Sequence, residues 1–437
     1  MYGLSESFLF DGNYTQFQLA NGMAVALLRA PTNTISGTLN VEVGSAHEQE
    51  GEEGLFHLLE HAIFKGGSAH FPPELAGEVI PTFGYFNAAT DVNRTSYQIG
   101  ILPEKLELFL QFISDLVFLP SFDPVRVERE RKRIMREIAD DYSRPEFIDN
   151  QNYNRALFDG HPFALDVAGK RPVLNKATIS DLVRIHSQSY HANNMTLILA
   201  GPLPPQTEGL IQTYFDCMPA GDNRKKELPS VRPLEERVIL HREASDLVDN
   251  DSPEESSARV SLGILVPPYN SPDSHKVKML AHALVSFTES RLFRIISDHE
   301  GLAYSIDGEY DGLYNKGLLE IRSPVYALKL KQAIDIMFRE MRRLQETPID
   351  DKELTALKDN ILYKMASKLE RSRHLVQAVE QYLDFGVAPI NEVERMQSVT
   401  SEDIVKAATA YLPRRINDGR YVMLVRDPFY TKNSPIS

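Results

Sequence analysis

The chain has 437 residues, of which 42% are hydrophobic and 25% charged, and its formal net charge is −14. Such a length and composition are typical of a globular protein with more than one domain, and the acidic balance argues against a nucleic-acid binder. A single cysteine, Cys217, excludes an internal disulfide, and no leader peptide or long apolar run is visible, so we expect a cytoplasmic protein without membrane contact.

The first part of the chain alternates strands and helices. The Asn21-Gly22 turn predicts a pair of strands within residues 16–30. Alternating apolar residues predict further strands over 35–46 and 94–102. Helical periodicity predicts four helices, over residues 52–65, 73–80, 104–117 and 124–141.

The later part of the chain repeats a pattern from the earlier part. Residues 179–202 and 401–428 share one pattern. In each, a helix begins after a Ser or Thr, and a polar loop then connects this helix to an apolar strand. The intervening residues 219–257 are rich in Pro, Asp, Glu and Ser, which indicates a linker and an exposed loop around one strand-like stretch. We therefore expect an α+β fold with two similar domains, residues 1–225 and 226–437.

The stretch GLFHLLEHAIFKGG, residues 54–67, contains two histidines one helical turn apart. On a helix, His57 and His61 would share one face, and Glu60 would border it. Two neutral imidazoles at this spacing can bind one zinc ion, and a carboxylate beside them can take a proton from water. The order H-x-x-E-H is the inverzincin signature. The alternative is a helix that packs through its leucines and turns its polar residues to solvent.

A catalytic zinc ion needs a third protein ligand. The segment 123–142 predicts a charged helix with a narrow apolar stripe. Glu130 and Glu137, seven residues apart, lie along one edge of this stripe, whereas Lys132 and Arg136 point away from it. Periodicity alone leaves two interpretations, a metal ligand or a solvated charge.

The combined motifs resemble the pitrilysin-like metallopeptidases, a group that includes short bacterial members similar to mitochondrial processing peptidase. The first motif consists of His57, Glu60, His61, Glu130 and Glu137. Residues 84–99 resemble the family's motif N-A-x-T-x-x-x-T-x-Y, and residues 290–306 resemble its second-domain signature S-R-L-F…G-L-A-Y-S. The resemblance extends over nearly the whole chain.

The resemblance implies a role for each motif residue. His57, His61 and Glu137 would bind one Zn²⁺ per chain, Glu60 would be the general base, and Glu130 would orient a ligand or assist the chemistry. The strand at Asn87–Tyr97 would be an open sheet edge to which a peptide substrate adds as an extra strand. The substrate-binding residues at this edge would be Asn87, Ala88, Ala89 and Thr90.

The resemblance also implies an architecture and an assembly. Each domain would be a mostly antiparallel sheet with helices packed on one face, and two chains would form a clamshell chamber. In the family, an Arg-Tyr pair in the second half steadies the tetrahedral oxyanion. Here Tyr304 is present, but Ser297 stands where the Arg is expected. We therefore expect a heterodimer with a homologous chain that supplies the Arg-Tyr pair, and otherwise a homodimer.

These observations predict a zinc-dependent endopeptidase that cleaves peptides or unfolded segments. The alternative is a non-catalytic or scaffold subunit that binds or presents a peptide, and Ser297 keeps that alternative open.

Overall fold

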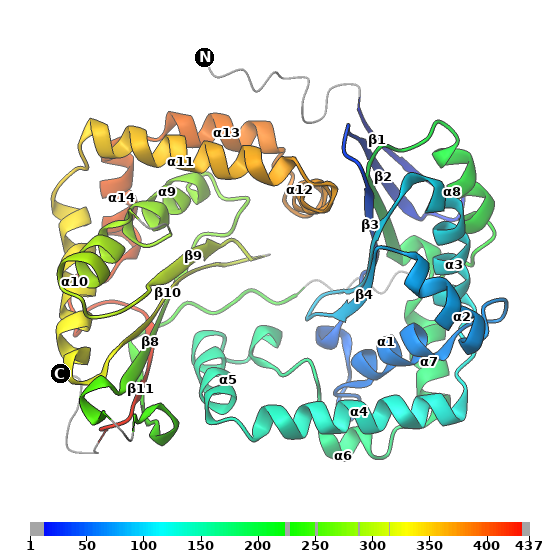
Figure 1. Ribbon diagram of the computed structural model, residues 1–437, viewed down its shortest axis with the longest axis horizontal. Coiled ribbons are helices and arrows are strands. Elements are labelled where there is room, and N and C mark those ends of the chain that lie inside the picture. The colour runs from blue at the N-terminus through cyan, green and yellow to red at the C-terminus, as the bar shows by residue number, and fades with distance from the viewer. Residues whose placement is uncertain (1–12, 223–227, 250–251, 287–288, 314, 431–437) are drawn as a thin grey trace. The chain divides into compact units, whose positions relative to one another are not determined.

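The computed structural model describes residues 13–430, except 223–227, 250–251, 287–288 and 314. The described chain forms two compact units (Figure 1). Unit 1 consists of the chain up to Ser143 together with Leu165–Leu228 and Met365–Leu383, and unit 2 consists of the remainder. Each unit therefore contains a helical segment from the other half of the chain, a feature that the sequence did not reveal.

Unit 1 is built on a six-stranded sheet in the order β1-β2-β6-β3-β5-β4. Strands β2 and β6 are parallel, and the other neighbours are antiparallel. The predicted hairpin around Asn21-Gly22 is present as the pair β1 and β2. The strands are β1 (Tyr14–Gln18), β2 (Ala24–Arg29), β3 (Ile35–Val41), β4 (Tyr85–Thr90), β5 (Thr95–Ile101) and β6 (Met195–Gly201).

Most helices of unit 1 pack on one face of this sheet and share a hydrophobic core with it (Figure 1). The four helices predicted in the first part of the chain are present, with ends that differ from the prediction by at most three residues. The helices of this face are α1 (Leu55–Gly66), α2 (Pro73–Val79), α3 (Leu106–Phe118), α4 (Pro124–Tyr142), α6 (Arg171–Leu174), α7 (Ile179–Ser189) and α8 (Thr207–Phe215).

The opposite face of the same sheet is covered by α12 (Ser372–Phe385), which comes from the second half of the chain. Alternate residues of a strand point to opposite faces, so β2 can serve both sides. Ala26 and Leu28 pack against Val379 and its neighbours on α12. Ser372 Oγ lies 2.8 Å from Ser36 Oγ, which fixes the start of the helix on the sheet.

Among the described residues, unit 2 repeats the topology of unit 1 without a counterpart of β1. Its five-stranded sheet has the order β7-β11-β8-β10-β9, with β7 and β11 parallel and the other neighbours antiparallel. Position by position, β7, β11, β8, β10 and β9 correspond to β2, β6, β3, β5 and β4. The strands are β7 (Val238–Glu243), β8 (Ser257–Val266), β9 (Asp307–Asp311), β10 (Gly317–Tyr326) and β11 (Val422–Asp427).

The helices of unit 2 also cover both faces of its sheet. Helix α5 (Pro145–Leu157), from the first half of the chain, packs on one face. Gly263 allows this close approach, because a Cβ there would lie 2.4 Å from Tyr153 Oη. The other helices are α9 (Ser274–Leu284), α10 (Leu330–Glu346), α11 (Asp351–Leu369), α13 (Pro389–Ser398) and α14 (Ser401–Tyr411), and a π-helix spans Phe293–His299.

The predicted repeat is visible in local detail. Thr178 and Asp181 form a capping box at the start of α7, and Thr400 and Asp403 form the same box at the start of α14. The fold is α+β with two similar domains, as the sequence predicts. Within the described ranges, no helix combines the length and the apolar character that crossing a membrane would require.

Candidate metal centre

Helix α1 presents the two histidines because both of its ends are fixed. Before the helix, the Glu48 carboxylate accepts hydrogen bonds from the amides of Gly54 and Phe56, each at 3.0 Å. These amides belong to the first turn, where no intrahelical acceptor exists. After the helix, Gly67 adopts a φ of 73°, where a side chain would be strained. Leu58 and Leu59 are buried in the core, so His57 and His61 lie on the other side of the helix.

Helix α4 runs beside α1 and supplies the carboxylates. Asp123 caps its first turn by accepting a hydrogen bond from the Arg126 amide at 2.9 Å. The predicted apolar stripe of Val127, Ile134 and Ile138 is buried. Glu130, at the edge of the stripe, is only 7% exposed.

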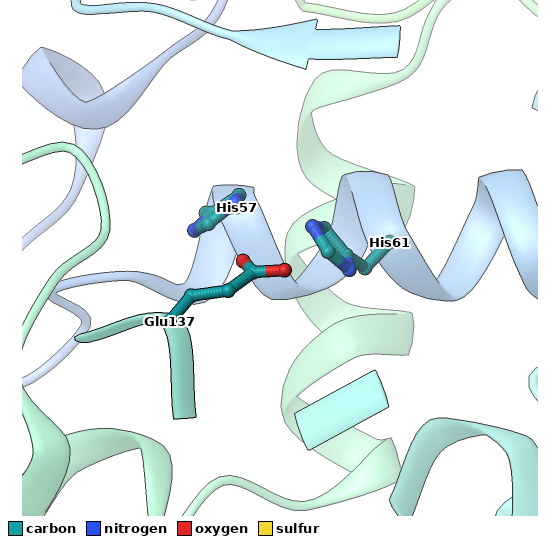
Figure 2. A group of neighbouring side chains, drawn as sticks. All are labelled: His57, His61 and Glu137. Carbon is teal, nitrogen blue, oxygen red and sulfur yellow. The ribbon is translucent and has the colours of Figure 1, made fainter. Parts of the chain in front are cut away.

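The two helices bring His57, His61 and Glu137 together (Figure 2). One potential ligand atom from each residue lies within 4.8 Å of the others. Zinc bonds are about 2 Å long and zinc prefers nitrogen and carboxylate donors, so this set of two imidazoles and one carboxylate fits a zinc ion. It is the one such group of three metal-binding side chains in the described part of the chain.

Burial shifts the pKa values of two side chains of the site, His57 and Glu60. Burial and the neighbouring His61 lower the pKa of His57 to about 4, against the opposing effect of the Glu137 carboxylate. His57 is therefore neutral at pH 7 and keeps a lone pair for a metal. Burial raises the pKa of Glu60, which is 5% exposed, although His61 and a hydrogen bond from Thr90 oppose the rise.

Two further contacts orient the ligands. His61 Nδ1 lies 3.1 Å from Glu130 Oε2, and Arg133 Nε lies 3.1 Å from Glu137 Oε1. Sequence reasoning did not single out Arg133, although its positions three residues after Glu130 and four before Glu137 are those at which helical side chains meet. It also missed Glu48, whose capping role depends on a loop that has no periodic pattern.

The expected substrate strand requires a correction. Asn87 and Thr95 do not lie on one strand, because residues 85–101 form a hairpin of β4 and β5. Strand β5 is internal, between β3 and β4, whereas β4 is an edge strand of the sheet. Asn87, Ala88, Ala89 and Thr90 all lie on β4, and Thr90 Oγ1 donates a 3.4 Å hydrogen bond to Glu60 Oε2. The open edge thus ends beside the proposed base.

The remaining predicted residues lie in unit 2. Tyr304 is 84% exposed, and its hydroxyl lies 3.0 Å from that of Tyr326. Ser297 lies on the π-helix, where the resemblance would place an Arg.

Unit 2 has a counterpart of α1 that lacks most of the metal donors. Helix α9 occupies the same place after β8 that α1 occupies after β3, and its Met279 and Leu280 are buried like Leu58 and Leu59. In that register, Lys278 and Ala281 replace a histidine and the glutamate, and only His282 remains. His282 Nε2 lies 3.1 Å from Asn360 Oδ1 on α11. In unit 2, a hydrogen bond between α9 and α11 thus occupies the position that corresponds to the candidate metal donors of α1 in unit 1.

Comparison with known families gives two matches that extend over most of the chain. The family described as Insulinase (Peptidase family M16) matches residues 24–171, and the one described as Peptidase M16 inactive domain matches residues 176–361.

Individual relatives agree with these matches. An uncharacterized zinc protease of Rickettsia felis is 23% identical over 410 residues, which cover 91% of this chain and 94% of that protein. A protease from Helicobacter pylori superposes with a TM-score of 0.80 at 20% identity, covering 95% of this chain and 99% of that chain. A peptidase M16 inactive domain from Pseudomonas fluorescens has a TM-score of 0.75 at 17% identity, with 97% of this chain and 100% of that chain covered. At such identities the two structures support the fold alone.

Proposed function

Because the chain belongs to peptidase family M16, we propose that it is a zinc-dependent endopeptidase that cleaves peptides or unfolded segments, with Glu60 as the general base. The observation that carries the proposal is the group of His57, His61 and Glu137 next to Glu60. These groups lie on the neighbouring helices α1 and α4, which supports the proposal.

The chemistry divides between the ion and the side chains. His57, His61 and Glu137 would hold the zinc ion, which would supply Lewis-acid chemistry for polarising a carbonyl group and acidifying water. Glu60 would accept the proton of the attacking water and pass it to the leaving amine. Burial favours the protonated form of Glu60 after the first transfer, which suits the second.

Strand β4 is the proposed binding site for the peptide backbone. It pairs with β5 on one side only, so backbone groups along its other side are available to an added strand. Such pairing depends little on side chains, which suits the cleavage of varied sequences. The exposed side chains of Tyr85, Asn87 and Ala89 would contact the peptide's own side chains.

The oxyanion would need donors from elsewhere. We include in the proposal a chamber formed by two chains, in which a homologous partner supplies an Arg-Tyr pair, because Ser297 replaces the expected Arg. Tyr304, with its exposed hydroxyl, is the candidate donor of this chain. Assay of the isolated chain and of a mixture with a homologous chain that carries the Arg tests this part. Full activity of the isolated chain would contradict it.

A scaffold subunit that only binds or presents peptide is the second candidate, and Ser297 is the observation that favours it. Metal analysis of the purified chain, combined with peptide cleavage before and after chelation, separates the two. Near-stoichiometric zinc that is lost in His61→Ala, with cleavage that chelation stops and zinc restores, supports the peptidase. A chain that binds zinc but cleaves no peptide, alone or with a homologous partner, supports the scaffold.

A further inference from the structure

The outer side of α4 carries a basic groove in an acidic protein. Whereas one edge of this helix holds Glu130 and Glu137, the exposed side chains of Arg129, Lys132 and Arg136 follow a single stripe at spacings of three and four residues. The chain as a whole has 61 acidic and 47 basic residues. A row of cations on such a background is therefore a local departure from the average surface.

The stripe borders a hollow of about 720 Å³. Arg131 crosses its rim and donates a 2.7 Å hydrogen bond to the carbonyl of Asn175, just after α6. Met135 adds an apolar wall. We define the basic groove by its lining, which consists of Glu128, Arg129, Arg131, Lys132, Met135, Arg136 and Asn175.

Two of these cations have no acidic partner. Glu128 is paired with Arg131 and lies 3.5 Å from Lys132. Arg129 and Arg136 take part in no ion pair with any residue that the structure describes, and neither does the exposed Arg171 at the start of α6. Unpaired like charges around one hollow repel each other, and an anion that binds there would relieve that repulsion.

We propose that the basic groove docks an acidic, extended segment of a partner protein. Arg129 to Arg136 spans about 10 Å along the helix, the length of roughly three residues of an extended peptide. Guanidinium groups suit carboxylates because they bind them through two hydrogen bonds. At the N-terminal end of the same stripe, Val125 is 68% exposed and gives such a segment an apolar contact.

The observations favour an acidic peptide over a nucleic acid. A duplex or long single strand would carry its phosphates beyond this short stripe, toward a surface whose net charge is −14. The groove lining also contains no aromatic side chain on which a base could stack. This inference does not depend on the proposed peptidase activity, since the groove lies on the side of α4 away from Glu137.

Fluorescence anisotropy tests the proposal with the zinc-loaded, full-length chain carrying Glu60→Gln, which prevents loss of the probe by cleavage. The probe is a labelled ten-residue peptide in which Glu and Gly alternate, except that one position is occupied by Leu. The double variant Arg129→Glu/Arg136→Glu should weaken its binding roughly tenfold or more, since each reversal both removes an attraction and adds a repulsion. The control, Lys331→Glu/Arg342→Glu on exposed positions of α10, makes the same change of net charge and should have little effect.

Circular dichroism of each variant reports whether it is folded, and a milder pair, Arg129→Gln/Arg136→Gln, should give an intermediate loss. Added salt should weaken the binding to the parent more than the binding to the double variant. The proposal is overturned if the groove variant and the α10 control variant weaken binding equally, or if the acidic peptide does not bind. It is also overturned if an oligonucleotide of equal charge binds more tightly than the peptide.

Discussion

His61 Nδ1 lies 3.1 Å from Glu130 Oε2, and this contact joins the two helices of the candidate metal centre. A carboxylate can only accept, so Nδ1 carries the proton and Nε2 keeps its lone pair. The ring is thereby held in the tautomer and orientation that a metal ligand needs. Glu130 is thus placed behind the candidate ligand His61, which is consistent with one of the two roles that the sequence resemblance implied for it.

Replacement of Glu130 tests this positioning role. In Glu130→Ala the ring of His61 loses its acceptor, and we expect zinc affinity to fall by about 10- to 100-fold. Competition with a chromophoric chelator measures the affinity. Glu130→Gln retains one acceptor oxygen and should lose less, and Glu128→Ala, two residues away on the same helix, should leave the affinity unchanged. An unaltered affinity in Glu130→Ala would show that the contact does not orient the ligand.

Zinc should stabilise the chain. A ligand that binds only the folded state at 100 times its dissociation constant adds about 2.7 kcal/mol to the free energy of unfolding. Thermal denaturation with and without zinc measures this gain, which His57→Ala and His61→Ala should abolish. His282→Ala provides a control, because that histidine lies on the metal-poor counterpart helix α9. A zinc effect that persists in both cluster variants would place the metal elsewhere.

Glu48 should make stability depend on pH. Burial raises its pKa from 4.5 to about 7, against the opposing hydrogen bonds from Gly54 and Phe56. The folded state therefore binds this proton more tightly than the unfolded state, and the resulting stability is present below about pH 4.5 and is lost as the pH rises through 7. Between these limits, the parent should lose about 3 kcal/mol of unfolding free energy relative to Glu48→Gln.

Urea denaturation at pH 4.5, 6 and 8 measures the difference. Glu50→Gln, an exposed position in the same loop, should differ from the parent by a constant amount at all three values. A difference between Glu48→Gln and the parent that does not change with pH would mean that Glu48 is not buried with a raised pKa in solution.

Arg426 should be essential for attaching α5 to unit 2. Its side chain is 2% exposed, lies 3.0 Å from Asp149 on α5, and contacts both carboxylate oxygens of Asp246. Arg426→Met would leave the buried Asp149 carboxylate with only the 3.6 Å contact to Arg242, and removal of this buried partner should cost about 3–5 kcal/mol. Adding Asp149→Asn to that variant should recover part of the loss. Hydrogen exchange at α5 locates the effect, and unchanged protection there would contradict the attachment.

The parts of the structure that depend on local pattern could be predicted from the sequence. The spacing of His57 and His61 on a helix with a buried leucine face places both imidazoles on one side. The edge position of Glu130 and Glu137 on α4 likewise follows from an apolar stripe with helical period. Asp123 caps that helix as its place before Pro124 indicated.

The remaining features depend on contacts between distant segments. The periodicity of residues 145–157 and 372–385 does not reveal that each helix packs on a sheet built by the other half of the chain. The hairpin at residues 85–101 was missed because its turn, around Asp91, interrupts a stretch that looks continuously extended. The approach of Glu137 to the histidines could be expected only through family resemblance, since Glu137 lies 76 positions after His61 in the chain.

The most direct test of the account compares peptide turnover by the zinc-loaded parent and by Glu60→Gln, with the zinc content of both measured in the same samples. If an Arg-bearing partner chain is required, it is added equally to both. We predict equal zinc contents near one per chain, turnover by the parent, and a loss of at least about 100-fold in Glu60→Gln, as for removal of a general base. Turnover by Glu60→Gln at the rate of the parent would contradict the account.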